Sequence, residues 1–229
     1  MNCVFILSHN IIGYKYYNYN KDDKLNSEIQ DLQPVINEAS DLDNNSSGEN
    51  DGQDQSKEGN YVNSANEEEL KSINSDYKMW IQIENTNINY PVVQSSDNDY
   101  YLKHNFRKES NISGTVFVES ANDIDNDKNI ILYGHNMRNG SMFQNLHKFE
   151  DEAFFKKHKE VYVYTPKKTY TYTIFAAYKF DDRHLLKTFN FKNKKKFENY
   201  LRNVKNIRDM GSHVRKDQEV TSNDKIITL

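Results

Sequence analysis

Residues 129–137 read NIILYGHNM, and this stretch is the strongest guide to the fold. Its first five residues form a mostly apolar run closed by a glycine, which is typical of a buried β-strand that enters a loop. Reactive side chains are often presented where a rigid strand feeds a loop, so His135 is a candidate catalytic residue. A lone histidine in such a place is still more often structural, and position alone leaves both interpretations open.

Further strand patterns lie on either side of this stretch. Residues 114–119 precede it, and residues 161–165 are expected to pair with 169–179, where threonine alternates with tyrosine as in a half-buried strand. The sequence ends on another strand pattern at 225–229. The best helix pattern is 194–207, whose apolar residues fall on one face. These patterns predict a mainly β domain with flanking helices, a barrel or a sandwich.

The amino-terminal part has a different composition. Residues 22–70 hold 14 acidic and 2 basic side chains. We expect 21–66 to be an acidic disordered linker, because such a segment buries too little apolar surface to offset its ordering entropy. Residues 1–20 contain a short, interrupted apolar patch, which predicts a partial membrane-anchor or signal-like segment. The folded domain is then expected over 67–229.

The overall composition excludes several classes of protein. A formal net charge of −4 argues against a uniformly basic nucleic-acid binder, so no nucleic-acid partner is expected. Cys3 is the single cysteine, which rules out a disulfide framework and a zinc site built on several thiolates. The seven histidines include no pair at the i, i+4 spacing of a helical metal site. We therefore expect neither a metal nor another cofactor.

The residues around His135 resemble the histidine segment of class B sortases, the cysteine transpeptidases that attach proteins to Gram-positive cell walls. Other blocks agree with that family in order and spacing. They are NINYPVVQ at 87–94, SGTVF at 113–117, the helix within 191–207 and NDKIITL at 223–229. The resemblance covers roughly residues 67–229.

The resemblance implies a closed β-barrel with a Cys/His/Arg active site. The cysteine attacks the carbonyl of a threonine in a C-terminal sorting signal and forms an acyl-enzyme. The histidine, carried onto His135, protonates the departing amine, and the arginine stabilises the oxyanion. The implied partners are surface proteins with sorting signals and an amino group of the peptidoglycan precursor. The implied location is the cell membrane, with the domain facing outward.

The resemblance also implies a substrate groove. Asn98 and Leu102 match family positions near the groove that holds the sorting signal. Leu185 and Leu186 fall in the segment before the long helix, which flanks the groove. For each of these two leucines, packing in the core is an equally good interpretation.

The sequence departs from the family at its carboxyl end. It stops at Leu229, where the family motif continues with two residues and then the cysteine, and the arginine lies later still. Cys3 cannot substitute, since it lies beyond the predicted linker. We therefore expect the 229-residue polypeptide to be inactive, with a barrel that lacks its last strand or strands. The alternatives are a non-catalytic sortase-like module that binds sorting peptides, or a decayed gene product.

Overall fold

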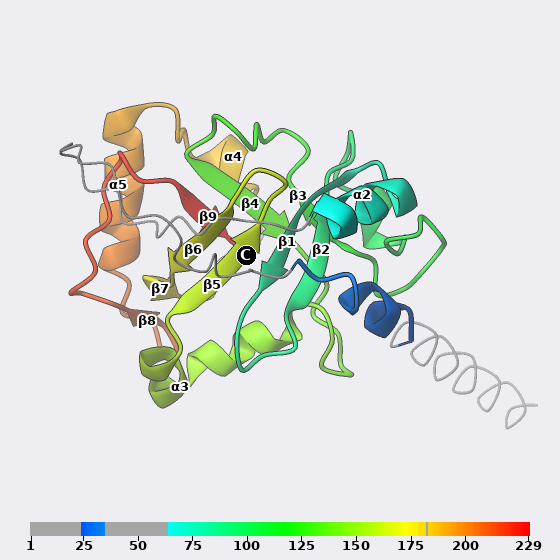
Figure 1. Ribbon diagram of the computed structural model, residues 1–229. Coiled ribbons are helices and arrows are strands. Elements are labelled where there is room, and N and C mark those ends of the chain that lie inside the picture. The colour runs from blue at the N-terminus through cyan, green and yellow to red at the C-terminus, as the bar shows by residue number, and fades with distance from the viewer. Residues whose placement is uncertain (1–23, 35–63, 182) are drawn as a thin grey trace, which may run out of the picture.

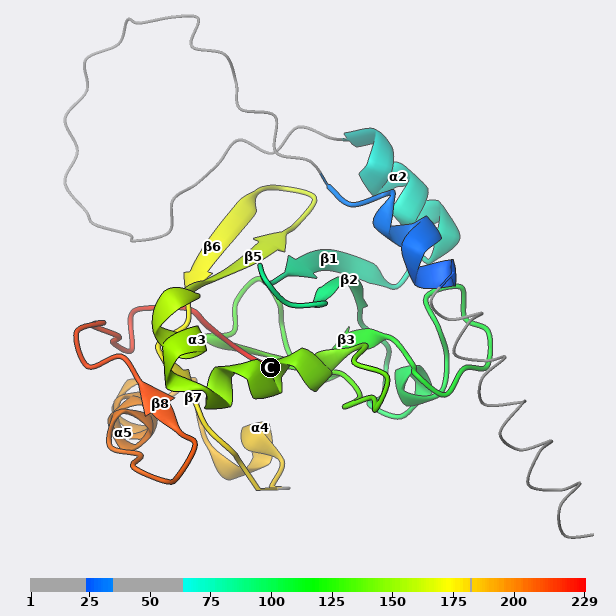
Figure 2. The same cartoon turned by 90° about the horizontal axis from the view of Figure 1, so that it is seen from below.

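The computed structural model describes residues 24–34, 64–181 and 183–229. Seven strands form one sheet in the order β6-β5-β1-β2-β3-β4-β9, which curls into a nearly closed barrel with β6 and β9 at its edges (Figures 1 and 2). These strands are β1 (Tyr77–Gln82), β2 (Asn89–Val93), β3 (Val116–Val118), β4 (Asn129–Tyr133), β5 (Glu160–Tyr164), β6 (Thr169–Thr173) and β9 (Ile226–Thr228). The prediction of a mainly β domain with flanking helices is confirmed.

Two of the strand pairs are parallel, β2 with β3 and β4 with β9, and the others in this sheet are antiparallel. β9 pairs with β4 through Asn129 opposite Ile226 and Ile131 opposite Thr228. The predicted pairing of 161–165 with the tyrosine-threonine strand is confirmed as β5 with β6, although β6 ends at Thr173. A separate two-stranded sheet joins β7 (Ala176–Ala177) to β8 (His213–Val214).

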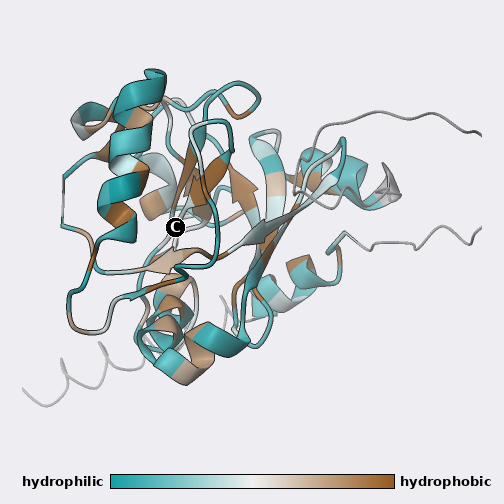
Figure 3. Ribbon diagram, turned by 90° about the vertical axis from the view of Figure 1, so that its left-hand side faces the viewer, coloured by the Kyte–Doolittle hydropathy of each residue, from teal (hydrophilic) through white to brown (hydrophobic). Residues whose placement is uncertain are grey.

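Helices pack around this barrel. They are α2 (Ser64–Ile73), α3 (Glu152–Lys157), α4 (Leu185–Thr188), α5 (Lys194–Lys205) and the 3-10 helices η1 (Tyr100–Leu102) and η2 (Phe143–Glu150). The helix predicted at 194–207 is confirmed as α5. Asn193 caps its start, since the Asn193 side chain accepts a hydrogen bond from the Lys196 N–H. Its apolar face packs inward, and its lysines give it a hydrophilic outer side (Figure 3).

The structure corrects part of the predicted linker. Residues 24–30 form a helix, although the acidic composition of 21–66 predicted disorder. Leu25, Ile29 and Leu32 recur at helical spacing, and Ile29 is 2% exposed within an apolar cluster of the domain. This buried apolar face supplies the stabilisation that composition alone did not reveal. The other predicted linker residues up to 63, except 31–34, lie outside the described residues.

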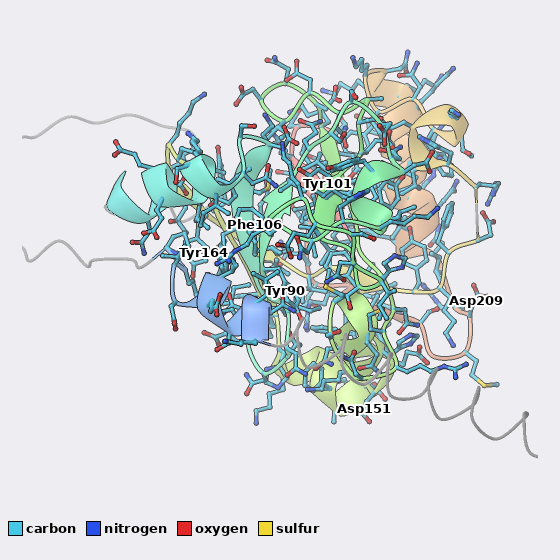
Figure 4. The ribbon with its side chains drawn as sticks, turned by 90° about the vertical axis from the view of Figure 1, so that its right-hand side faces the viewer. Tyr90, Tyr101, Phe106, Asp151, Tyr164 and Asp209 are labelled. Atoms are coloured by element: carbon cyan, nitrogen blue, oxygen red, sulfur yellow. The ribbon has the colours of Figure 1, made fainter. Side chains whose placement is uncertain are left out.

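This cluster also contains the aromatic side chains of Tyr101, Phe106 and Tyr164. Figure 4 shows these three rings in the body of the domain, with Asp209 at its periphery. Polar contacts attach the helix at 24–30 to the same region, since Glu28 pairs with Arg107 at 3.2 Å. The amino-terminal helix is therefore part of the folded domain.

None of the helices in the described ranges has the length and apolar character needed to cross a membrane. The membrane-anchor segment predicted at residues 1–20 lies outside those ranges, and so does Cys3.

Candidate active site

His135 lies two residues beyond the end of β4, in a loop that is fixed by close backbone contacts. Gly134 is required there, because a Cβ at this position would lie 2.9 Å from the ring of Phe143. The carbonyl oxygen of His135 accepts a hydrogen bond from the Phe143 N–H at 2.9 Å. Asn136 and Met142 then form an isolated β-bridge. The strand, the glycine and the following 3-10 helix together hold the histidine backbone in place.

The imidazole of His135 is half-buried, and its Nε2 lies 2.7 Å from the carbonyl oxygen of Leu102. Because a carbonyl oxygen only accepts, Nε2 carries a proton in this contact. Nδ1 is then the nitrogen through which the ring can gain or lose a proton. This arrangement suits a general acid or base whose orientation is set by the main chain.

The Leu102 carbonyl lies close to Gly114, which leaves room for it. Gly114 has a φ of +61°, and a Cβ on it would lie 2.4 Å from the carbonyl oxygen of Tyr101 and 3.1 Å from that of Leu102. Only glycine tolerates both the backbone conformation and this close approach. The glycine in the SGTVF block therefore leaves room for the carbonyl that orients His135.

The carboxyl end of β9 points in the same direction as the carboxyl end of β4, which leads to His135. Because β4 and β9 are parallel, with Ile131 opposite Thr228, the chain leaves β9 alongside the last residues of β4. Leu229 packs against the main apolar cluster of the barrel. Residues that continue this strand direction are thus aimed at the loop that carries His135.

Asn98 does not stand alone, because its side chain contacts the buried carboxylate of Glu119. Its Nδ2 donates to Glu119 Oε1 at 2.7 Å, and its Oδ1 accepts from the Ser120 N–H at 2.8 Å. The other carboxylate oxygen of Glu119 accepts from the Tyr133 hydroxyl at 2.9 Å and lies 3.1 Å from Nε2 of His184. The structure therefore brings Asn98 together with residues at the ends of β3 and β4 and the start of α4.

These contacts decide the charge of Glu119. Burial alone raises the pKa of a carboxyl group, and the Glu119 side chain is only 1% exposed. The hydrogen bonds from Asn98, the Ala121 N–H and Tyr133, together with the charge of His184, outweigh burial and hold the Glu119 pKa below its usual value. Burial and the same contact raise the pKa of the Tyr133 hydroxyl. Glu119 is thus a buried, ionised carboxylate at neutral pH.

Comparison with known proteins identifies the family. A model of the sortase domain family matches residues 81–229. The chain belongs to the sortase family. Its sequence is 39% identical over 163 residues to sortase B of Listeria monocytogenes, covering 70% of this chain, and 32% identical over 163 residues to sortase B of Staphylococcus aureus, covering 71%. These matches place it in class B. The matched regions span 64% and 65% of those two relatives.

The barrel is also shared with solved class B structures. The structure of Clostridium perfringens sortase B is similar with a TM-score of 0.65 and 42% identity, over 70% of this chain and 87% of that one. A structure described as a Staphylococcus aureus sortase B-substrate complex is similar with a TM-score of 0.63 and 30% identity, over 71% and 74% of the two chains. The nearly closed barrel is therefore the sortase B fold, as the family resemblance implied.

The two predicted groove leucines of this sortase domain lie on α4. Leu185 is 8% exposed and packs in the apolar cluster formed with α5, which supports the core-packing interpretation for it. Leu186 is partly buried against the same cluster. For all four groove residues, contact with substrate stays a prediction. Among the described residues no group of three His, Cys, Asp or Glu side chains is arranged to hold a metal ion.

Sequence reasoning missed four groups close to the candidate site, namely Glu119, Tyr133, His184 and the Leu102 carbonyl. Glu119 had a usable signal, because it is the first charged residue after the buried strand β3, as His135 is after β4. His184 had only its place next to the predicted groove leucines. The carbonyl had no signal, since every residue carries one.

Proposed function

We propose that this chain is the catalytic domain of a class B sortase, a cysteine transpeptidase that cleaves a C-terminal sorting signal after threonine. It then joins the released protein to an amino group of the cell wall. The single observation that carries the proposal is the parallel register of β4 and β9 beside His135. That register directs the strand that in this family leads to the nucleophile toward an imidazole already oriented by Leu102.

In the proposed reaction, the thiolate adds to the threonine carbonyl carbon and the carbon–nitrogen bond breaks. His135 gives the departing amine its proton, from Nδ1 because Leu102 occupies Nε2. The incoming amine attacks the thioester, the carbon–sulfur bond breaks, and the amine proton returns to His135. The arginine of the family stabilises the oxyanion in both steps.

The 229 residues contain neither the cysteine nor the arginine at the positions that the family motif requires. We therefore propose that the 229-residue polypeptide itself does not turn over. One similar solved structure is of a mutant form of Clostridium perfringens sortase B that carries a cysteine-to-serine substitution.

The partners and the location follow from the same proposal. The substrates are surface proteins that carry sorting signals, and the acceptor is an amine of the peptidoglycan precursor. Asn98, Leu102 and Leu186 would face the sorting signal, with Leu185 supporting them from the core. Residues 1–20 would attach the domain to the outer side of the cell membrane.

A chimera tests this proposal. The chain is continued after Leu229 with the matching C-terminal segment of Listeria monocytogenes sortase B and assayed with a threonine-containing sorting peptide and an amine acceptor. We expect cleavage, a thioester intermediate visible by mass spectrometry, and a loss of about 10³-fold in kcat for His135→Ala. The 229-residue polypeptide should be inactive in the same assay.

Three results would count against the proposal. They are turnover by the 229-residue polypeptide, a folded chimera without activity, and full activity of the His135→Ala chimera. Peptide binding by the 229-residue polypeptide, combined with an inactive chimera, would instead support a non-catalytic module that binds sorting peptides.

A further inference from the structure

The carboxylate of Glu119 is the most heavily bonded buried charge near the candidate site. Its Oε1 accepts from Asn98 Nδ2 at 2.7 Å, from the Ala121 N–H at 3.2 Å and from the Ser120 hydroxyl at 3.3 Å. Its Oε2 accepts from the Tyr133 hydroxyl at 2.9 Å and pairs with His184 Nε2 at 3.1 Å. The proposed chemistry uses none of these contacts.

These contacts join three segments that are far apart in sequence. Asn98 lies between β2 and η1, four residues before Leu102, whose carbonyl orients His135. Tyr133 is the last residue of β4, two residues before His135. His184 immediately precedes α4, which carries Leu185 and Leu186. These three segments supply the candidate site residues that precede β9, and each of them contacts the carboxylate of Glu119.

Each partner depends strongly on Glu119. Within the described part of the chain, Nδ1 of His184 is buried without a hydrogen-bond partner, so the contact of Nε2 with Glu119 orients the ring. The Tyr133 hydroxyl and the Asn98 amide both point their hydrogens at the carboxylate. A neutral amide in place of the carboxylate presents only one acceptor oxygen, so it cannot satisfy donors on both sides.

We propose that Glu119 is a positioning residue of the transpeptidase site. Acting through Asn98, Tyr133 and His184, it holds the two sides of the sorting-signal groove and the end of β4 at a fixed spacing around His135. This inference rests on the proposed function. Glu119 itself touches no reacting atom, since its oxygens are enclosed by its protein partners.

The chain offers a matched control. The hydroxyl of Tyr162 donates to Glu160 at 2.6 Å, which is the same pair of groups as Tyr133 and Glu119. Glu160 is exposed on β5 and contacts no candidate site residue in the described ranges. Glu160→Gln and Tyr162→Phe therefore repeat the chemical changes away from the site.

The first experiment measures kinetics in the chimera described above. Glu119→Gln should lower kcat/KM by about tenfold or more, because small misplacements of catalytic groups are costly. His184→Ala should act mainly by raising KM, since it frees α4 at the groove. Tyr133→Phe should act mainly by lowering kcat, since it loosens the strand end next to His135. The Glu160→Gln and Tyr162→Phe chimeras should stay within twofold of the parent.

The second experiment needs no nucleophile and uses the 229-residue polypeptide. Hydrogen–deuterium exchange should rise in Glu119→Gln at 95–103, 133–137 and 183–189 together, and remain unchanged in β1 and α5. If Glu119→Gln fails to fold, His184→Ala and Tyr133→Phe test the proposal instead. Each should show faster exchange in its own segment and at Asn98. The proposal is overturned if these folded variants keep the exchange of the parent, or if their kcat/KM stays within twofold of it.

The two experiments separate this inference from the proposed function. An inactive parent chimera defeats the transpeptidase proposal, and the exchange measurement still decides whether Glu119 fixes the three segments. An active parent chimera with an equally active Glu119→Gln variant defeats the positioning role and leaves the transpeptidase proposal standing.

Discussion

The two halves of the candidate site are held in different ways. Around His135 the geometry comes from the main chain, through the Leu102 carbonyl and two glycines, Gly114 and Gly134, that permit close approach. Around Glu119 it comes mainly from side chains and charge, through a buried carboxylate that accepts four hydrogen bonds and pairs with His184. The first half should therefore respond to changes of shape, and the second to changes of charge and pH.

Removing the charge of Glu119 should have the largest effect on stability. Breaking a buried ionic network by changing one partner leaves the other groups unsatisfied, so Glu119→Gln should lower the free energy of unfolding by about 3 kcal/mol. Glu160→Gln, at an exposed pair, should change it by less than about 0.5 kcal/mol. Urea unfolding of the 229-residue polypeptide measures both. Equal effects of the two substitutions would contradict the view that the buried charge of Glu119 holds its half of the site together.

Filling the space at Gly114 should break the other half by shape alone. Gly114→Ala places a Cβ against two carbonyl oxygens at a positive φ and should cost about 2 kcal/mol or more in the free energy of unfolding. Gly211 also has a positive φ, of 76°, but its nearest neighbouring atom is 3.7 Å from a Cβ placed there, so Gly211→Ala isolates the backbone strain. Gly211→Ala should lower the free energy of unfolding by less than Gly114→Ala does. Thermal or urea unfolding measures both.

Removing one hydrogen bond to the buried carboxylate should have an intermediate effect. Tyr133→Phe should lower the free energy of unfolding by about 1.5 kcal/mol, since hydrogen bonds to charged groups are the stronger ones. Tyr162→Phe removes a shorter contact, 2.6 Å against 2.9 Å, but one that water can replace. Its effect should be within about 0.5 kcal/mol. If contact length rather than burial controlled the energy, unfolding experiments would rank the two variants in the opposite order.

The smallest expected effect is a difference in pH dependence between the halves. The folded-state pKa of Glu119 lies below its usual value, so its stabilising contribution is complete above the unfolded pKa of about 4.3 and is lost as pH falls through the folded pKa. The gap in unfolding free energy between the parent and Glu119→Gln should therefore shrink below about pH 4. The gap for Gly114→Ala should stay constant from pH 7 to pH 3.5. A constant gap for Glu119→Gln would refute the charge-based account.

Local patterns in the sequence predicted much of the fold. The alternation at 169–173 predicted β6, and the apolar face of 194–207 predicted α5, because each pattern reports a nearby buried surface. The position of His135 after a buried strand made it a candidate, and the family resemblance favoured a catalytic role, which stays a prediction. The helix at 24–30 was missed, because the acidic composition around it outweighed its three apolar residues. These residues pack against side chains that are distant in the sequence.

The Glu119 network could not be predicted from local sequence. Its partners Asn98, Tyr133 and His184 come from three segments that only the folded barrel brings together. The Leu102 carbonyl is invisible for a different reason, since a main-chain group has no sequence signature. The only trace of its position in the sequence is Gly114, which leaves room for the carbonyl.

The parallel pairing of β4 with β9 has a consequence for the order of events during synthesis. Asn129 and Thr228, whose side chains hydrogen-bond at 2.9 Å, are 99 residues apart. At typical translation speeds β4 must wait about 5 to 20 s for this neighbour to be made. Contacts of such high sequence separation also form slowly. The nascent domain therefore carries an apolar strand with one side unpaired until β9 has been made, and the surroundings of His135 are completed only then.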